Sequence, residues 1–259
     1  MSGRNASISC DSHTLKCLQI NLRHSKAASA NLAQLILDRS LDIILIQEPY
    51  VFPGLPPSIA NVPPGYSSFH ALTNDHAYGA AVIVRDSLAR LGKLVTKHHG
   101  NNAACVELRT KSGSFRFASV YLRPSLPDLL STFVPVLSSL ASPSTIFGVD
   151  GNAKHPMWNS RLLDRRGAEL ESLLVTYSLN VANRESSLLD FIPCDTAFVD
   201  VTLFGSGIDV SSWFFLSDAS LSDHPYVYFE VGQAFFELPP PRSNGPAVPK
   251  ATNVVLKFS

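Results

Sequence analysis

The sequence lacks the features that assign many proteins to a class at once. It has no Gly-rich loop of the P-loop or dinucleotide-binding type, so nucleotide-cofactor chemistry has no support. It has neither a secretory signal at its start nor a run of about eighteen apolar residues, so we expect a soluble, intracellular protein. Its cysteines are scattered, without the short spacing of a zinc site or a disulfide framework: Cys10, Cys17, Cys105 and Cys194.

The sequence also lacks an excess of either charge. Lys and Arg total 21, and Asp and Glu total 21, so the formal net charge is zero. A free-standing DNA-binding module usually has a basic excess, which argues against tight binding dominated by phosphate contacts. An enzyme that touches few phosphates is compatible with this balance. So is a module whose affinity comes from other parts of a longer polypeptide.

Apolar residues, in contrast, are plentiful. Hydrophobic residues make up 45% and charged residues 16% of the 259 positions, which is enough apolar material for a large core. We expect one globular domain over residues 15–231. Residues 1–14 are polar and rich in Ser, as in a disordered lead-in. Residues 232–259 are rich in Pro, as in an extended linker, which suggests that this domain is part of a larger polyprotein.

Short β-rich runs alternate with helical patterns along the chain. Apolar residues fall on one helical face over residues 28–36 and 170–177. A third helix is expected from residue 129 to residue 140, with Ser125 as its N-cap and Pro127 in its first turn, and Pro135 predicts a kink or break inside it. Strands are expected at residues 41–46, 79–84, 118–122, 145–149, 199–204, 213–216 and 226–231.

One connection predicts how the strands pair. Residues 105–109 and 114–122 flank a short Thr-Lys-Ser-Gly connection, which favours a hairpin and hence antiparallel strands. Because the alternation of strands and helices elsewhere favours parallel pairing, the sheet is expected to be mixed. Residues 51–78 are rich in Pro and Gly and contain His70 and His76, so we interpret them as a variable loop region.

Polar residues recur where the apolar strands end, and sheet ends are where α/β proteins usually collect ligands. Asp200 is unusual because it lies within an apolar strand, where burial is costly without a partner. Asp223 and His224 immediately precede the last strand. The other residues of this pattern are Gln19, Asn21, Gln47, Glu48, Tyr121, Asp150 and Asn152.

Each of these residues also has a structural interpretation when taken alone. Glu48 before Pro49 could be a solvated strand terminus. Asp150-Gly151-Asn152 could be a turn, because turns select these residue types. The Ser-Asp-His-Pro run at residues 222–225 could cap a loop. For Asp200, a hydrogen-bonding or functional role stands evenly against having no such role.

The residues are more informative as a set, because their chemistry is complementary. A hard divalent cation takes oxygen ligands, which Glu48 supplies, with Asp223 as a candidate second carboxylate; Mg2+ fits such a site better than zinc. Hydrolysis of a phosphodiester also requires a polarised water, donors for the developing charge, and an aligned acid or base. Side chains of these kinds are Asn21, Tyr121, Asp150, Asn152 and His224.

Six short motifs and their order along the chain resemble those of the endonuclease/exonuclease/phosphatase superfamily. This superfamily includes apurinic/apyrimidinic endonucleases, DNase I and retrotransposon endonucleases. The motifs span about Leu15 to Val231. They are Gln19-Ile20-Asn21, Gln47-Glu48-Pro49, Val120-Tyr121-Leu122-Arg123-Pro124, Gly148-Val149-Asp150-Gly151-Asn152-Ala153-Lys154-His155, Phe198-Val199-Asp200-Val201-Thr202-Leu203 and Ser222-Asp223-His224.

Finer features resemble the non-LTR (LINE-type) retrotransposon branch. They are the run from Asn152 to Trp158, the segment from Arg166 to Leu170, Trp213 shortly before the Ser-Asp-His motif, and the Pro-rich exit. Tryptophans such as Trp158 and Trp213 are more often core or interface aromatics than DNA contacts, and His155 could merely cap a loop.

The resemblance implies a fold and an activity. The fold is a four-layer α/β sandwich, in which two packed mixed β-sheets are flanked by helices. The activity is a Mg2+-dependent endonuclease, with Mn2+ as a substitute, that nicks one strand of double-stranded DNA. The 3′-hydroxyl left at the nick would prime reverse transcription by a covalently linked reverse transcriptase, and the protein would act in the nucleus.

The resemblance also implies roles for individual residues. Glu48 would hold the metal, supported by Asn21, and Asp150 would position or deprotonate the attacking water. Asn152 and Tyr121 would steady the phosphoryl oxygens. His224, oriented by Asp200, would contact the scissile phosphate or its departing oxygen, and Asp223 would be an auxiliary ligand or would orient one. Which group is the general base stays open.

The chain departs from the family pattern in two places. Gly151 stands where the family usually has a bulky residue, often Phe, which predicts a looser geometry between Asp150 and Asn152. A Ser or Thr that binds phosphate in relatives has no clear counterpart, and the candidates are Ser186, Ser187 and Thr196. Three other functions stay open: an abasic-site repair endonuclease, a phosphoesterase of small substrates such as inositol phosphates or sphingolipids, and a domain that binds its target without cleaving it.

Overall fold

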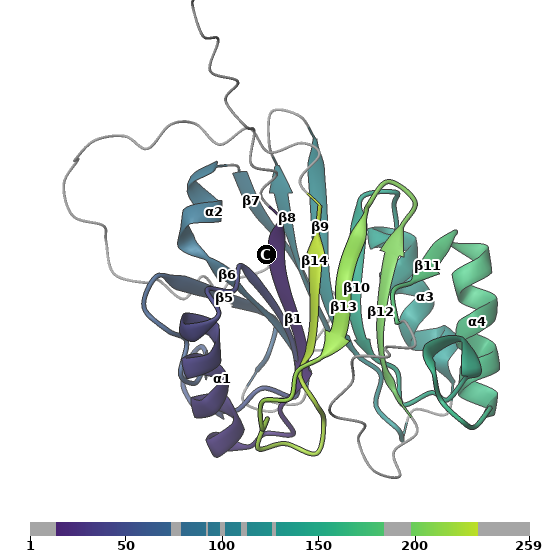
Figure 1. The fold of residues 1–259 in the computed structure, drawn as a ribbon, viewed down its shortest axis with the longest axis horizontal. Helices are drawn as coiled ribbons and strands as arrows, with labels where there is room; N and C mark the ends of the chain where they lie inside the picture. Colours follow the sequence, from purple (N-terminus) through teal and green to yellow (C-terminus); the bar gives the residue numbers. More distant parts are fainter. Residues whose placement is uncertain are drawn as a thin grey trace, which may run out of the picture.

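Two six-stranded sheets pack face to face, and helices cover their outer faces (Figure 1). This is the four-layer α/β sandwich expected from the sequence. The computed structural model describes residues 14–73, 79–91, 93–98, 102–109, 113–125, 128–183 and 198–232. The expected lead-in and Pro-rich tail therefore lie almost entirely outside the described residues.

The first sheet contains both ends of the domain. Its strand order is β13-β14-β1-β2-β6-β5, in which β1 and β2 are parallel and the other neighbours are antiparallel. The strands are β1 (Leu15–Asn21), β2 (Ile43–Gln47), β5 (Tyr66–His70), β6 (Ala80–Arg85), β13 (Val210–Phe215) and β14 (Val227–Val231).

The second sheet repeats this arrangement with the middle of the chain. Its order is β11-β12-β10-β9-β8-β7, and β9 and β10 are its parallel pair. The expected hairpin is confirmed, because β8 and β9 pair in an antiparallel register from Ala103–Val120 to Arg109–Ser114. The strands are β7 (Lys93–His98), β8 (Ala103–Arg109), β9 (Ser114–Tyr121), β10 (Thr145–Asp150), β11 (Leu179–Val181) and β12 (Asp200–Gly205).

Strand β2 explains why some strands look uniformly apolar in the sequence. All five of its residues are buried, because each of its faces meets a different core. Ile43 and Leu45 lie in the core between the two sheets. Ile44 and Ile46 lie in the core beneath α1 (Lys26–Asp38), which begins at the N-cap Ser25.

Helices α3 (Leu129–Leu140) and α4 (Arg165–Thr176) cover the second sheet, on the side away from α1 (Figure 1). Their apolar faces share one core with β10, in which Phe133 and Leu170 are fully buried. The remaining elements are α2 (Asp86–Leu91), the short strands β3 (Val51–Phe52) and β4 (Ser58–Ile59), and a 3-10 turn, η1 (Pro156–Trp158). None of the described helices has the length and hydropathy that crossing a membrane requires.

In α3 the structure differs from the sequence-based expectation in the N-cap and in the absence of a break at Pro135. Its N-cap is Asp128, whose carboxylate accepts from the amides of Leu130 and Ser131, and not Ser125. Pro127 lies outside the described residues. Helix α3 also runs through Pro135 without a break. A proline inside a helix costs about 3 kcal/mol, but Pro135 is on the exposed face, and the opposite face is anchored in the core.

The interpretation of residues 51–78 as a loop region was wrong in part. The segment contains β3, β4 and all of β5, which forms an edge of the first sheet. The sequence of β5, Tyr-Ser-Ser-Phe-His, buries polar Ser68 and His70 and so hides the apolar alternation of a strand. Residues 74–78, including His76, lie outside the described residues.

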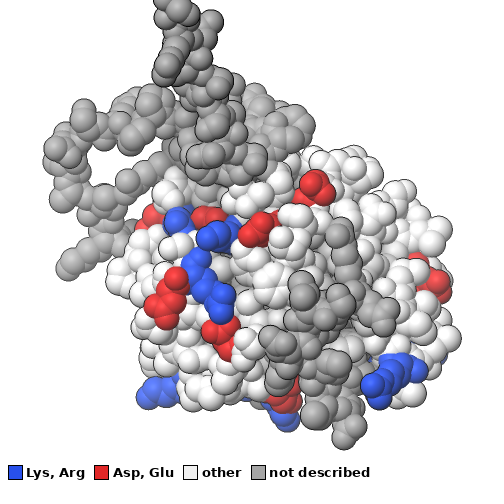
Figure 2. Space-filling view, in the orientation of Figure 1, with Lys and Arg blue, Asp and Glu red and all other residues white. Residues whose placement is uncertain are grey.

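Charged side chains are interspersed on the molecular surface. On the face drawn in Figure 2, basic and acidic residues lie next to one another among a largely uncharged surface. This distribution matches the zero net charge of the chain. On this face, the described residues therefore form no extended basic surface.

Candidate active site

The polar residues noted at strand ends come together at one rim of the sandwich. Asn21 ends β1, Tyr121 ends β9, and Asp150 ends β10, while Glu48 directly follows β2. Because each parallel pair of strands ends at the same edge, these side chains surround a pocket of about 490 Å³. The expected site residues that line it are Asn21, Glu48, Tyr121, Asp150, Asn152, Asp223 and His224.

Asn21 joins the two sheets at the centre of the site. Its amide nitrogen donates to Glu48 Oε2 at 3.0 Å and to Asp150 Oδ2 at 2.7 Å. Its amide oxygen accepts from the backbone N–H of Arg23 at 2.7 Å. With all three bonds made in the protein interior, Asn21 is held in one orientation and fixes the spacing of two carboxylates.

Glu48 is held as an anion. Its backbone has a positive φ of 46°, which turns the chain sharply after β2 and directs the side chain into the pocket. The Nε2 atom of His24 lies 3.3 Å from Glu48 Oε1. Burial acts to raise the pKa of Glu48, but hydrogen bonds from His24 and Asn21 outweigh it and hold the pKa of this carboxyl below its usual range.

Asp150 has the opposite environment. It is only 1% exposed, and burial, assisted by the neighbouring carboxylate of Asp200, raises the pKa of Asp150 to about 7. The backbone N–H and the side-chain amide of Asn152 both donate to Asp150 Oδ1, at 3.2 and 3.1 Å. A carboxyl group with this pKa can accept and release a proton near neutral pH.

The looser geometry expected at Gly151 is therefore not observed. Besides the two bonds between Asn152 and Asp150, the Gly151 amide donates to the carbonyl of Val199 at 3.0 Å. Gly151 itself is buried, and a Cβ atom there would lie 3.5 Å from Leu170 Cδ2. Helix α4 thus fills the space that a bulky side chain would need.

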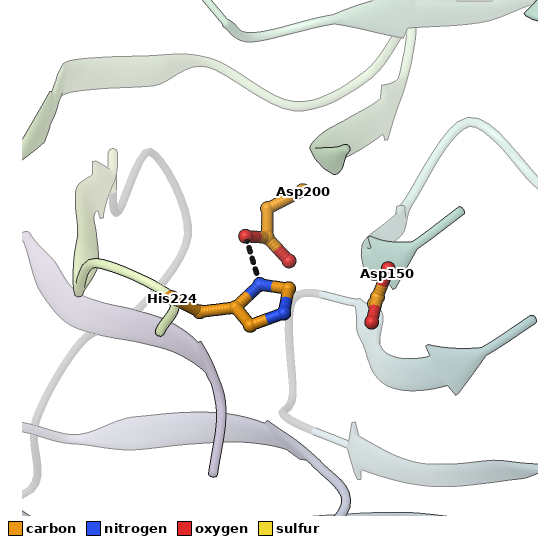
Figure 3. Close-up of side chains that lie close together, drawn as sticks. All are labelled: Asp150, Asp200 and His224. Atoms are coloured by element: carbon orange, nitrogen blue, oxygen red, sulfur yellow. Dashed lines mark hydrogen bonds and ion pairs between the residues drawn. The ribbon is translucent and has the colours of Figure 1, made fainter. Parts of the chain in front are cut away.

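His224 lines the pocket and forms a hydrogen-bonded pair with Asp200 (Figure 3). Nδ1 of His224 lies 2.7 Å from Asp200 Oδ2, and the other ring nitrogen points toward Asp150. Burial favours the neutral imidazole, but the charge of Asp200 and its hydrogen bond outweigh burial and raise the pKa of His224 to about 10. His224 therefore carries a proton at neutral pH.

The loop that carries His224 is tied to β1. Ser222 Oγ donates to the carbonyl of Asn21 at 2.8 Å, and Ser220 Oγ donates to the carbonyl of His224 at 2.6 Å. Asp223, in the same loop, is paired with Arg23, and its side chain is 49% exposed. Asp223 therefore lies at the outer edge of the pocket, and its role as a metal ligand stays a prediction.

The closest group of metal-binding side chains among the described residues is Asp150, Asp200 and His224, which offer ligand atoms within 4.8 Å of one another. The Oδ1 atom of Asp200 is buried and has no hydrogen-bond partner among the described residues. The carboxyl groups of Asp150 and Asp200, together with the ionised Glu48, provide the oxygen donors that a hard divalent cation prefers.

The remaining candidates have structural roles or cannot be placed. Trp213 donates to Thr202 Oγ1 at 3.0 Å between the sheets, and Trp158 is fully buried. His155 accepts from the Met157 amide at 3.0 Å and caps η1, as its structural interpretation predicts. The proposed phosphate contacts of Ser186, Ser187 and Thr196 lie outside the described residues.

Gln19 and Gln47 belong to the strand-end pattern noted in the sequence, which assigned them no role, and they support the site from behind. Gln19 Nε2 donates across the sheets to the carbonyl of Val149 at 3.3 Å. Gln47 Nε2 donates to Ser119 Oγ at 2.9 Å and to the carbonyl of Gly148 at 3.0 Å. His24 was missed by sequence reasoning, although its position three residues after Asn21 is visible in the sequence. Its approach to Glu48 depends on the positive φ of 52° at His24.

Comparisons with known proteins agree with this geometry. A family model described as endonuclease-reverse transcriptase matches residues 115–228. The chain is 28% identical over 137 residues to the RNA-directed DNA polymerase from mobile element jockey of Drosophila funebris, a match that covers 52% of this chain and 14% of that protein. It is 26% identical over 164 residues to the probable RNA-directed DNA polymerase from transposon BS of Drosophila melanogaster, covering 61% and 18%.

Among solved structures, the endonuclease domain of TRAS1, a telomere-specific non-LTR retrotransposon, is similar over nearly its whole length. The TM-score is 0.69 at 28% identity, and the match covers 85% of this chain and 98% of that domain. The chain thus matches most of a solved endonuclease domain. It spans less than a fifth of the length of the two curated relatives it matches, at 14% and 18%.

Proposed function

We propose that the chain is the endonuclease domain of a non-LTR retrotransposon, a member of the endonuclease/exonuclease/phosphatase superfamily. It nicks one strand of double-stranded DNA and leaves a 3′-hydroxyl that primes reverse transcription. The observation that carries the proposal is the convergence of Glu48, Asp150 and His224, from both sheets, on one pocket. The similarity to the TRAS1 domain supports the substrate class.

We propose Mg2+ as the cofactor. Glu48 would hold it, with Asn21 orienting the carboxylate, because Glu48 is the pocket carboxyl whose pKa is held low. Asp223 is the candidate for an additional ligand. The unpartnered Oδ1 atom of Asp200 indicates room for further oxygen coordination in the same region. When bound, the cation supplies stabilisation of negative charge on the phosphoryl oxygens.

The chain's own residues then divide the proton chemistry. Asp150, whose pKa is close to neutrality, accepts the proton of the attacking water. His224 is protonated because of Asp200, so it donates a hydrogen bond to the developing charge or to the departing 3′-side oxygen. Asn152 and Tyr121, at the ends of neighbouring strands, lie where they can contact the phosphoryl oxygens.

The partners follow from the same proposal. The curated relatives are RNA-directed DNA polymerases, which supports a covalently linked reverse transcriptase in the full-length protein. Because the net charge is zero, the linked polypeptide would supply much of the affinity for DNA. The target would be chromosomal DNA in the nucleus.

Nicking of supercoiled plasmid tests the proposal. The chain should convert it to open circle in the presence of Mg2+, and the nicks should carry 3′-hydroxyls that a DNA polymerase extends. Asp150→Ala and His224→Ala should abolish conversion, whereas Asn180→Ala, at an exposed position of β11, should retain it. Retained nicking by both site variants, or none by the parent chain in Mg2+ or Mn2+, would reject it.

Binding of the cation can be tested without turnover. Mg2+ should raise the melting temperature of the parent chain, because a ligand that binds only the folded state stabilises it. Glu48→Gln should remove this increase, since it removes the charge that holds the cation. An equal increase in both proteins would show that Glu48 is not the ligand.

A phosphoesterase of small substrates is the second candidate function, and the zero net charge favours it. An abasic-site endonuclease shares the same chemistry on damaged DNA. Parallel turnover measurements on intact DNA, abasic DNA and a soluble phosphoester separate the three. The proposed function requires intact DNA to be cleaved at least as fast as the other two.

A further inference from the structure

Arg166 lies in the first turn of α4 and donates hydrogen bonds to three backbone carbonyls. Its Nε atom donates to Asn152 O at 3.0 Å, and its Nη2 atom donates to Gly151 O and to Leu122 O, each at 2.9 Å. Gly151 and Asn152 follow β10, and Leu122 follows β9. One guanidinium therefore joins the loops that leave both parallel strands at the rim.

These loops carry site residues in direct sequence. Leu122 follows Tyr121, and its amide donates to the carbonyl of Asp150 at 2.9 Å. Asn152 has a positive φ of 45°, a conformation that asparagine adopts more readily than most non-glycine residues, and its bonds to Asp150 help to hold it. Gly151 has no side chain that could anchor the loop in the core. The Gly151 amide and the amides of Asn152 hold one side of the loop, on Val199 and Asp150, and Arg166 holds the carbonyls of both residues.

The position of Arg166 is itself fixed by how α4 begins. The N-cap Asp164 accepts from the amides of Gly167 and Lys154, at 2.7 and 3.1 Å, and so binds the helix to the same loop. A Cβ atom on Gly167 would lie 2.0 Å from Lys154 O, so only glycine permits this approach. The neighbouring Arg165 is different, because its side chain is 73% exposed and pairs with Glu169 within the helix.

The guanidinium group is suited to this contact in a way that an ammonium is not. It presents five donors in a rigid plane, so Nε and Nη2 can address carbonyls of different loops at once. Lysine has a compact ammonium on a flexible stem and cannot fix the same relative geometry. A displacement of about 1 Å at a reacting group can reduce the rate of an enzyme by about a hundredfold.

We propose that Arg166 is a positioning residue for phosphodiester hydrolysis, which holds the Asp150-Gly151-Asn152 loop in register with Tyr121. The inference rests on the proposed function. Arg166 makes its contacts with the backbone behind the pocket and is not one of the pocket's lining residues. Its loss should therefore reduce kcat and leave KM for DNA nearly unchanged.

The test compares Arg166→Ala and Arg166→Lys with the matched control Arg165→Ala. We expect kcat for plasmid nicking to fall about tenfold to a hundredfold in Arg166→Ala. KM should stay within about threefold of the parent value, since substrate-binding groups are retained. Arg166→Lys should recover only part of kcat, and Arg165→Ala should have the parent values. Millimolar guanidinium should restore part of the kcat of Arg166→Ala, which a variant that is merely misfolded would not allow.

Amide hydrogen exchange at Gly151 and Asn152 provides a second measurement that needs no activity. Exchange should be faster in Arg166→Ala and Arg166→Lys than in the parent chain, and unchanged in Arg165→Ala. If the parent chain fails to nick DNA, the proposed function falls, and exchange still decides whether Arg166 holds the loop. A folded Arg166→Ala with parent kcat, or with parent exchange at both amides, would overturn the inference.

Discussion

Two carboxyl groups of the site differ in the direction of their pKa shifts. Glu48 and Asp150 share the amide donor of Asn21, yet the pKa of one carboxyl is lowered and that of the other is raised. The difference arises because Asp150 is almost fully buried next to Asp200, whereas Glu48 has His24 beside it. Two carboxyls with separated pKa values are suited to separate tasks: one binds a cation and one moves a proton.

The raised pKa of Asp150 predicts a pH dependence of stability. The folded protein keeps this proton up to about pH 7, whereas the unfolded chain loses it near pH 4. The unfolded state therefore binds fewer protons in this range, and Asp150 lowers the stability of the parent as the pH rises from 4 to 7. Asp150→Asn should not lose stability in this way, because asparagine does not titrate between pH 4 and pH 7.

Urea denaturation in metal-free buffer measures the effect. The free energy of unfolding of Asp150→Asn, minus that of the parent, should increase between pH 4 and pH 7 and level off above. Asn180→Ala, exposed on β11, should show a constant difference. A difference that stays flat or decreases for Asp150→Asn would contradict the assignment.

Glu107 predicts the opposite trend, far from the site on β8. It is 2% exposed, and although burial acts to raise its pKa, Arg109 and Arg116 lower the pKa of Glu107 to about 2. Its folded pKa is depressed, so its contribution is present above about pH 4.5 and is lost as the pH falls toward 2. Glu107→Gln should reduce the free energy of unfolding at pH 7 by roughly 2 kcal/mol, because it removes a buried negative charge from two arginines. The loss is moderate because solvent partly screens the half-exposed Arg109.

Acid titration of unfolding, followed by circular dichroism, checks this expectation. The variant should lose less stability than the parent between pH 4.5 and pH 2, so the two curves should converge. Because β8 pairs Glu107 with Arg116 at the end of β9 away from Tyr121, nicking at pH 7 should be nearly unchanged in a folded variant. If the stability curves of the variant and the parent stay parallel between pH 4.5 and pH 2, Glu107 does not cause the loss of stability in acid.

At the level of elements, helix α4 packs so closely against the loop after β10 that no side chain fits between them at Gly167. Gly167→Ala would place a Cβ atom 2.0 Å from Lys154 O, so either the helix or the loop must move. Overpacking of this kind costs about 1–3 kcal/mol. We expect a loss of stability in this range, accompanied by reduced nicking, because the loop carries Asn152.

The control lies in the same helical turn. Ala168 is exposed, so Ala168→Ser should change the free energy of unfolding by less than about 0.5 kcal/mol and leave nicking unchanged. Thermal unfolding and plasmid nicking of both variants are the measurements. A Gly167→Ala protein with the stability of the parent would show that the helix can withdraw from the loop at no cost.

Elements were predictable from the sequence where local patterns and packing agree. Helices α1 and α4 have apolar residues at helical spacing, and β10 is a continuous apolar run, so their existence and type were expected. Local patterns failed where packing outweighs them. Pro135 lies within α3 because the buried face of that helix offsets the proline, and polar β5 is a strand because it pairs with β6.

At the scale of the whole molecule, the active site exists only because the two sheets are held at a fixed separation. Asn21 and Glu48 belong to the first sheet and Asp150 to the second, so any change in sheet stacking alters their distances. Gly148 permits the approach, since a Cβ atom there would lie 2.9 Å from Leu45 Cδ1 and 3.0 Å from Gln19 Oε1.

Gly148→Ala should therefore reduce both stability and activity. We expect a loss of about 1–3 kcal/mol in the free energy of unfolding, from forced repacking of Leu45. We also expect a fall in kcat of about tenfold or more, because the two halves of the site separate. Gly113→Ala is the matched control, since among the described residues its added Cβ atom would meet Phe115 Cε2 alone, at 3.9 Å. Equal kcat in the two variants would contradict this account.

The sequence by itself determined the residue types of the site, their order along the chain and the class of the fold. These are legible because strand ends and motifs are local, each confined to a few neighbouring residues. The tertiary structure alone decided the contacts. The bond from Asn21 to Asp150 spans 129 positions, and the ion pair of Arg23 with Asp223 spans 200. Arg166 acquires its role only when α4 packs against the β10 loop, because no local pattern specifies which distant carbonyl a side chain will meet.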